Sequence, residues 1–344
     1  MNKKFCLLIG AVFIVWSGVC VFGQDKDPNA TEVLRHYKES LSWIQSLSME
    51  IDVGTHTSDS KPDREIVPYK TNFVFRRDHD RTEWIGELLT LDQNGVVDTS
   101  KSFVLNDVMT GEHYGSVIGI VNELPDVAMI TSDYEERQKK LLDSPDRAGA
   151  LFGKMQGSSH KGVAELLAGA ATLRLRDGQE NVNGVSCYVL EAMTEHGKVT
   201  AWIAPEKGYS ALKWSIDKRK DRDDLLNESP ISQNSWLAVF DAVELQKVGD
   251  VFVTTGGCLT HTINFADGRT IVFRHKYKVS EVKLTPDFGA LGAFVFNLPD
   301  GTPVNVEEYP GIRYVWKNGQ IVPADDPTFE EIDKMVEELK KEQQ

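Results

Sequence analysis

The 344-residue sequence predicts a mainly β fold with some α-helix: a large curved antiparallel sheet in the form of an unclosed β-barrel, with an N-terminal helix and a lid of short helices. Apolar and polar residues alternate through most of residues 47–122 and 171–284, as they do in half-buried strands. The expected strands 250–265 and 269–284 each exceed ten residues, which is typical of a large curved sheet rather than a compact sandwich. A helical pattern precedes the first strand, and another interrupts the strands at about residues 133–168.

The composition is that of a globular chain, with 41% hydrophobic and 26% charged residues. Lysine and arginine together number 38 against 52 aspartates and glutamates, which gives a formal net charge of -14. Such an acidic chain lacks the basic surface that binding to nucleic-acid phosphates requires. We therefore expect no nucleic-acid partner.

The first 23 residues have the pattern of a secretory signal peptide. Lys3 and Lys4 precede an apolar stretch over residues 5–16, and small residues follow up to Gly23. We expect cleavage after Gly23 and a periplasmic mature protein. The alternative is a retained membrane anchor, because the apolar run with its extension to Phe22 is about long enough to span a bilayer.

Two cysteines, Cys187 and Cys258, remain once residues 1–23 are removed. Both lie in strand-like segments, and the periplasm permits disulfides. Two alternatives are open here: a cross-strand disulfide between them, or a pair of free buried cysteines.

The first elements follow from a change of period. Polar capping groups at Asp27 to Thr31 and apolar residues at helical spacing predict a helix over about residues 30–46. Leu47 to Val53 then alternates, as a half-buried strand should. Further strands are expected at residues 69–77, 84–91, 96–105 and 114–121, with a hairpin turn at Asn94-Gly95.

The rest of the chain divides at the helical insertion. Short strands and hairpins are expected from residue 171 to residue 216, followed by long strands at 236–245, 250–265 and 269–284. Strands around residues 294–296 and 314–322 and a terminal helix from Asp326 form the tail. The expected organisation is thus a signal peptide (1–23), a half-barrel domain (24–285) and a C-terminal extension (286–344).

Catalytic and metal-binding motifs are absent from the sequence. It contains no HExxH, GxSxG, Walker or strand-linked GxGxxG pattern. No two of its eight histidines have i,i+2 or i,i+4 spacing, so no local metal site is visible. We expect neither an enzyme nor a cofactor-binding protein.

Three stretches carry a resemblance to a known family. These are ATEVLRHYKESLSWIQSLSMEIDV, TNFVFRRDHDRTEW and NVNGVSCYVLEA followed by GKVTAWIAPEKGYSALKWSI. In order and pattern they resemble the opening helix and strand, the second hairpin and the late hairpins of periplasmic outer-membrane lipoprotein carriers of the LolA/LolB type. The stretch FNLPDGTPVNVEEYPGIRYVW resembles C-terminal extensions of exported LolA-like proteins.

The resemblance implies an unclosed antiparallel barrel with a helical lid that binds acyl chains of lipoproteins. It also implies a basic residue on a strand that helps to hold the lid shut, for which Arg76 and Arg77 are the matching positions. The chain departs from the family in its greater length, its extra tail and its more charged loops, and one fold hosts many functions.

Burial of methylenes alone, at about 0.8 kcal/mol each, suffices to bind an acyl chain in an apolar groove. The candidate lining residues of such a groove are Phe73, Phe75, Trp84, Leu88 and Phe103, and those of the lid are Leu151, Phe152 and Met155. The competing interpretation is that these side chains fill an ordinary core. A carrier predicts a dry cavity of roughly several hundred Å³ beneath residues 145–168.

The leading functional hypothesis is a periplasmic lipid- or lipoprotein-binding carrier whose partners are acyl chains and inner- or outer-membrane proteins. The alternative is a non-enzymatic envelope sensor or protein-binding module of the RseB-like type.

Overall fold

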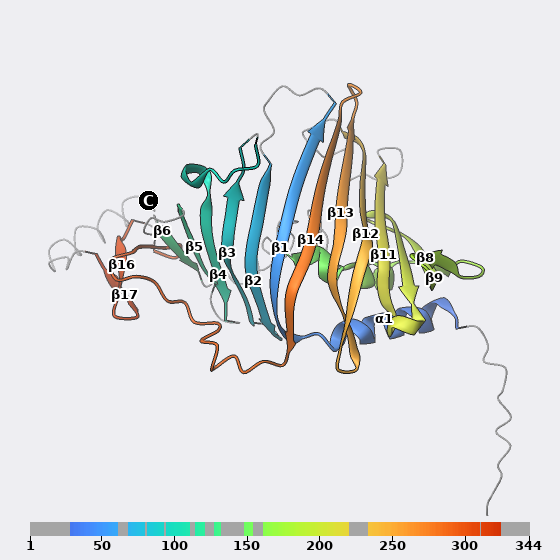
Figure 1. The fold of residues 1–344 in the computed structure, drawn as a ribbon, viewed down its shortest axis with the longest axis horizontal. Coiled ribbons are helices and arrows are strands. Elements are labelled where there is room, and N and C mark those ends of the chain that lie inside the picture. Colours follow the sequence, from blue (N-terminus) through green and yellow to red (C-terminus); the bar gives the residue numbers. More distant parts are fainter. Residues whose placement is uncertain are drawn as a thin grey trace, which may run out of the picture.

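A computed structural model describes residues 28–60, 68–79, 81–92, 94–110, 114–120, 127–131, 148–153, 161–219, 233–309 and 311–324. Their dominant feature is one sheet of 17 strands (Figure 1). The expected signal peptide, Met155, the terminal helix and most of the 133–168 insertion lie outside the described residues. None of the helices within these ranges is long and apolar enough to cross a membrane.

The sheet begins at β9 (Val185–Thr194), whose outer edge pairs with the short strands β7 (Leu173–Leu175) and β8 (Glu180–Val182). Going across the sheet, the next strands are β10 (Gly197–Ala204), β11 (Ser210–Arg219), β12 (Gln233–Val248), β13 (Val251–Phe265) and β14 (Thr270–Leu284). Strand β14 pairs with β1 (Ser46–Asp59) and thereby joins the two halves of the chain.

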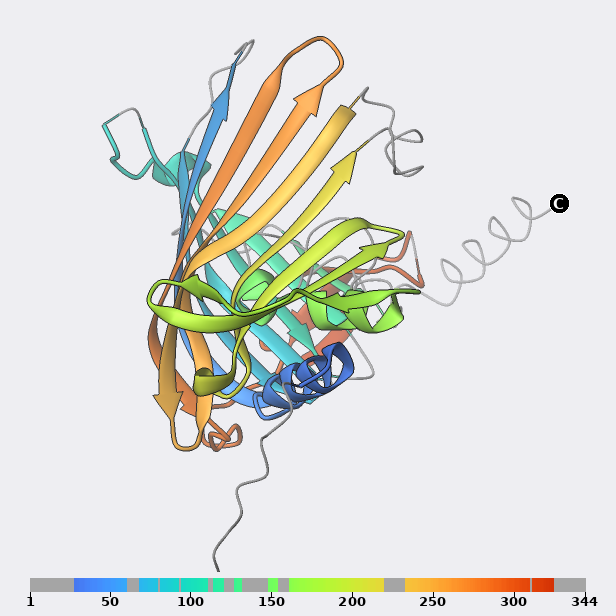
Figure 2. The same ribbon diagram turned by 90° about the vertical axis from the view of Figure 1, so that its right-hand side faces the viewer.

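From β1 the sheet continues through β2 (Tyr69–Asp78), β3 (Arg81–Thr90), β4 (Phe103–Met109), β5 (Tyr114–Ile120) and β6 (Val127–Thr131). It ends with β15 (Pro303–Val306), β16 (Tyr314–Lys317) and β17 (Gln320–Pro323). All pairs are antiparallel except β6 with β15. Among the described strands β17 at one end pairs with neither β7 nor β8 at the other, so the sheet curves without closing, as the sequence predicts (Figure 2).

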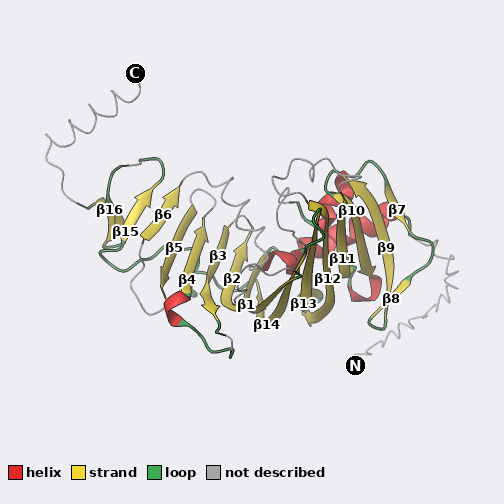
Figure 3. Cartoon of the chain, turned by 90° about the horizontal axis from the view of Figure 1, so that it is seen from above, coloured by secondary structure: helices red, strands yellow, loops and turns green. Residues whose placement is uncertain are grey.

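Three short helices cover one face of this sheet, which we call the inner face. They are α1 (Ala30–Ser42), the 3-10 helix η2 (Ala148–Phe152) and α3 (Val163–Gly169), and Figure 3 shows them inside the curve of β9–β13. Helix α1 begins where the polar sequence predicts, because the Asn29 and Glu32 side chains each accept a hydrogen bond from the other's backbone N–H at 3.0 Å. It ends at Ser42, four residues earlier than expected.

The core lies between these helices and the inner face. Alternate residues of β1 are 0–2% exposed, as their period-two pattern predicts: Leu47, Met49, Ile51 and Val53. From the helices, Val33, Tyr37, Leu166 and Leu167 pack against them. The prediction of a strand over residues 96–105 is wrong in its first part. The Asp98 side chain caps a 3-10 turn, η1 (Thr99–Lys101), and the strand starts only at Phe103.

The segment after β14 crosses the opposite, outer face of β3–β5 before it adds the last three strands. Leu298 joins Val117, Ala128, Val304 and Trp316 in a second, smaller core there. The C-terminal extension therefore continues the same sheet, and its strands at 303–306, 314–317 and 320–323 differ from the expected 294–296 and 314–322.

Candidate functional site

The strand register brings the five predicted groove residues to one face of the sheet. Phe73 and Phe75 of β2 pair with Gly86 and Trp84 of β3. Leu88 of β3 lies between Thr71 of β2 and Phe103 of β4. Because side chains alternate along a strand, all five point to the inner face. Their environments nevertheless differ.

Phe73, Phe75 and Trp84 form a closed aromatic cluster. The Trp84 ring centre lies 4.2 Å from that of Phe75 and 5.1 Å from that of Phe73, and the three side chains are 1–7% exposed. Phe152 of η2 lies over this cluster, with its ring centre 5.4 Å from that of Phe75. The lid is thus in contact with the predicted groove, but at this position aromatic side chains fill the groove.

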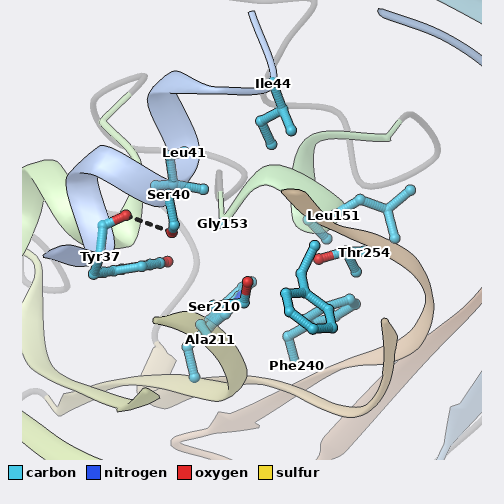
Figure 4. Close-up of a pocket in the computed structure, with 13 residues that line it drawn as sticks. Tyr37, Ser40, Leu41, Ile44, Leu151, Gly153, Ser210, Ala211, Phe240 and Thr254 are labelled. Carbon is cyan, nitrogen blue, oxygen red and sulfur yellow. Dashed lines mark hydrogen bonds between the residues drawn. The ribbon is translucent and has the colours of Figure 1, made fainter. Parts of the chain in front are cut away.

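The interior beneath the described part of the lid is also filled. Leu151 is 3% exposed, and the cavity that it lines between α1, η2 and β11–β13 has about 20 Å³, room for about one water molecule (Figure 4). Figure 4 shows Tyr37 and Ser40 of α1 on one side of it and Ser210 and Phe240 on the other. The prediction of a cavity of several hundred Å³ is wrong for this part of the lid, because core side chains occupy the space.

The two basic candidates lie on opposite faces of β2. Arg76 points to the outer face, where its guanidinium lies 2.6 Å from the Glu83 carboxylate. Its predicted role at the lid is therefore wrong, because β2 alternates between its faces and Phe75 takes the inner one. Arg77 shares the inner face with Phe75, and burial lowers its pKa while the carboxylate of Glu165 on α3 opposes that shift.

An open apolar surface continues from the aromatic cluster along the inner face of β3–β5. Leu88 pairs with Phe103, and Leu105 pairs with Ile118 of β5, so these four side chains are neighbours on one face. Phe103 is 42% and Ile118 50% exposed, while Leu88 and Leu105 are half-buried. We call these four residues the inner apolar patch.

Neither Leu105 nor Ile118 is among the residues that the sequence predicts for the groove. Leu105 lies two residues after the predicted groove residue Phe103 on the expected strand, so alternation from Phe103 is the signal that could have placed it on the same face. Ile118 lies on the next strand, and its place beside Leu105 depends on the register between β4 and β5, which no local pattern specifies.

A polar band crosses the inner face beyond the core. The Thr55 hydroxyl lies 3.0 Å from Nδ1 of His275, and the His275 and His261 rings meet edge to face at 5.9 Å. These side chains are 2–6% exposed, and burial, with a smaller contribution from His275, lowers the pKa of His261 to about 3. His261 is therefore neutral at physiological pH.

Cys187 and Cys258 are both free thiols. Strand β9 is separated from β13 by three strands of the sheet, and Cys187 is buried in the core while the neighbouring Leu259, not Cys258, takes the inward position on β13. The disulfide alternative is therefore wrong. Burial raises the pKa of the Cys187 thiol to about 11, which leaves it protonated at neutral pH.

Within the described ranges, no group of three or more histidine, cysteine, aspartate or glutamate side chains is arranged to hold a metal ion.

Neither a protein-family model nor a curated protein matches the chain. A solved structure of lipid–protein interactions in lipovitellin matches with a TM-score of 0.34 and 8% identity, over 71% of this chain and 26% of that chain. The ywiB protein from Bacillus subtilis matches with a TM-score of 0.17 and 3% identity, over 68% of this chain and 94% of its own.

An N-terminal dehydratase from the difficidin assembly line matches with a TM-score of 0.14 and 7% identity, over 78% of this chain and 88% of its own. The chain spans about a quarter of the lipovitellin chain. At TM-scores this low, none of these likenesses bears on what the chain does, and the resemblance to the LolA/LolB carriers stays a prediction.

Proposed function

We propose that the protein is a non-enzymatic periplasmic carrier that holds an acyl chain of a lipid or lipoprotein on the inner apolar patch. In this proposal inner- or outer-membrane proteins supply and receive the cargo, as the resemblance to the LolA/LolB carriers implies. The signal-peptide pattern of residues 1–23 supports the periplasmic location.

The observation that carries the proposal is the exposure of Phe103 and Ile118 on the inner face. Folding leaves these two large apolar side chains in water, next to half-buried Leu88 and Leu105, although they face the side of the sheet that elsewhere is covered by helices. Contiguous exposed apolar residues indicate a site that another molecule covers. An acyl chain fits this surface because its methylenes need only apolar contact, each contributing about 0.8 kcal/mol.

The location of the site differs from a closed carrier cavity. The Phe73–Phe75–Trp84 cluster and the lid fill the interior, so the acyl chain would lie along β3–β5 beside that cluster rather than beneath α3. Phe73, which lies in the same row across the strands as Leu105 and Ile118, and Trp84 would then form the end wall of the site.

The test is the lipid content of the purified protein. Wild type and a variant with both Phe103→Asp and Ile118→Asp are exported, purified and extracted with organic solvent, and the extracts are analysed by lipid mass spectrometry. We expect acyl chains in near-stoichiometric amount from wild type and at least about tenfold less from the double variant, because two charges on the patch oppose apolar contact.

The matched control is Val96→Asp, since Val96 is 61% exposed in the turn between β3 and β4 and lies outside the patch. It should retain the wild-type lipid content. A lipid-free extract from folded wild type would contradict the carrier proposal.

The second candidate is the envelope sensor or protein-binding module. It is favoured by the edge of β17, which in the described structure pairs only with β16 and so presents backbone groups to which a partner can add a strand. Pro323→Thr and Ile321→Pro would change binding of an envelope protein without changing lipid content, which separates the two functions.

A further inference from the structure

An open pocket of about 420 Å³ lies where the C-terminal half of α1 meets the turns before β11 and before β13. Its volume is in the range of small-molecule sites. Its lining includes three aromatic and two acidic side chains: Trp43, Tyr209, Phe252, Glu39 and Asp250. It shares Ser40, Ser210 and Phe252 with the 20 Å³ cavity of Figure 4, so it is the outer neighbour of that cavity and not part of the inner apolar patch.

The aromatic side chains offer ring faces at the protein surface. Trp43, the C-cap of α1, is 70% exposed, the largest exposed fraction among the large apolar side chains of the described residues. Tyr209 is held in a left-handed conformation at φ 61° and stacks on His36 with a ring distance of 4.4 Å. The Phe252 ring already has an ammonium group beside it, because Nζ of Lys207 lies 5.7 Å from its centre.

The charged side chains that line the pocket are carboxylates, with the Arg35 guanidinium on Glu39 and the Lys207 ammonium beside Phe252 at its edge. Glu39 and Asp250 are among the described residues that line it, whereas no lysine or arginine is. The hydrogen bond from Arg35, at 2.6 Å, holds the pKa of Glu39 below its ordinary value, so Glu39 is ionised at neutral pH. Asp250 occupies the exposed turn between β12 and β13.

We propose that this pocket binds a small organic ammonium ion, with the cation against the faces of Trp43 and Phe252 and close to Asp250. Aromatic faces and a carboxylate together attract a weakly hydrated cation, and the rings offer no ligand atoms to a metal ion. This site is independent of the acyl site, because the two share no residue.

The experiment is calorimetric titration of the full protein with choline and with its neutral carbon isostere, 3,3-dimethylbutan-1-ol. We expect saturable binding of choline and at least about tenfold weaker binding of the isostere, because only choline carries the charge. Trp43→Ala and Asp250→Asn should each weaken choline binding by about tenfold. Asp267→Asn, which removes a carboxylate from the turn at the other end of β13, should leave it unchanged.

Equal binding of choline and its isostere, or no saturable binding of choline, would overturn the proposal even if a variant failed to fold. So would undiminished choline binding by folded Trp43→Ala and Asp250→Asn proteins. Lipid content is measured on the same samples, and a change in it would concern the acyl site alone.

Discussion

The imidazole of His261 is buried against the sheet, and one of its nitrogens has no hydrogen-bond partner within the described structure. Its side chain is 3% exposed, and within the described structure Nε2 has no hydrogen bond. Trp236 and His275 contact its ring at 5.4 and 5.9 Å, so aromatic packing rather than hydrogen bonding holds it. A buried polar atom of this kind costs about 1–3 kcal/mol of stability.

We predict that His261→Leu raises the free energy of unfolding at pH 7 by about 1 kcal/mol and flattens its pH dependence. The folded-state pKa is about 3 and the ordinary value 6.5, so between these pH values the unfolded chain binds a proton that the folded chain excludes. Stability is therefore lost as the pH falls below 6.5, by up to about 2 kcal/mol at pH 5 for this residue. Urea unfolding of wild type and His261→Leu at pH 7.5 and at pH 5 measures the free energy of unfolding of each protein. An equal loss of this free energy between the two pH values in both proteins would refute the lowered pKa of His261.

Glu83 is a charge placed under the C-terminal extension. It is 2% exposed, pairs with Arg76 at 2.6 Å, and accepts a hydrogen bond from the backbone N–H of Phe294 at 3.3 Å. We predict that Glu83→Gln lowers the free energy of unfolding by about 3 kcal/mol, because it leaves Arg76 without its counter-charge. Lys101→Ala, which breaks an exposed pair with Asp98, should cost less than about 1 kcal/mol, and similar losses in both variants would contradict this account.

The segment between β14 and β15 is held to the outer face of β3–β5 by close apolar contact. Phe294 packs under the Arg81 guanidinium at 4.7 Å, and Phe296 lies on Gly115 of β5. A Cβ at Gly115 would lie 2.7 Å from the Phe296 ring, closer than atoms can approach. The Phe296 ring can therefore pack here only because residue 115 is a glycine.

We predict that Gly115→Ala lowers the thermal midpoint and that Phe296→Ala relieves most of that loss when the two are combined. In a double-mutant cycle the coupling should be at least about 1 kcal/mol, because the alanine methyl clashes only while the Phe296 ring is present. Gly54→Ala, where nothing lies within 4 Å of the added Cβ, is the matched control. Additive effects of Gly115→Ala and Phe296→Ala would show that the Phe296 ring does not pack on residue 115.

At the scale of the whole molecule, the sequence was sufficient for the class of fold. Alternation over residues 47–53 and long strands near residues 250 and 270 predict a large open antiparallel sheet, and β1, β13 and β14 are its longest central strands together with β12. These patterns lie within short stretches of the chain, so the sequence alone shows them. The pairing of β14 with β1 joins residues more than 200 positions apart, and no local pattern specifies it.

The candidate site was predicted only in part for the same reason. Alternation along β2 puts Phe73, Phe75 and Arg77 on one face and Arg76 on the other, so it could have excluded Arg76; it could not show that the aromatic side chains fill the groove. Trp43 and Phe252 line the same pocket although they are more than 200 positions apart, and no local sequence pattern predicts that arrangement.

The carrier proposal places an acyl chain on the inner apolar patch. Photo-crosslinking with a diazirine-bearing fatty acid, followed by peptide mapping, tests it most directly. We predict adducts on the peptides that contain Phe103 and Ile118, suppressed by excess unlabelled fatty acid and absent when both residues are changed to aspartate. Adducts confined to other peptides, or adducts that unlabelled fatty acid does not suppress, would contradict it.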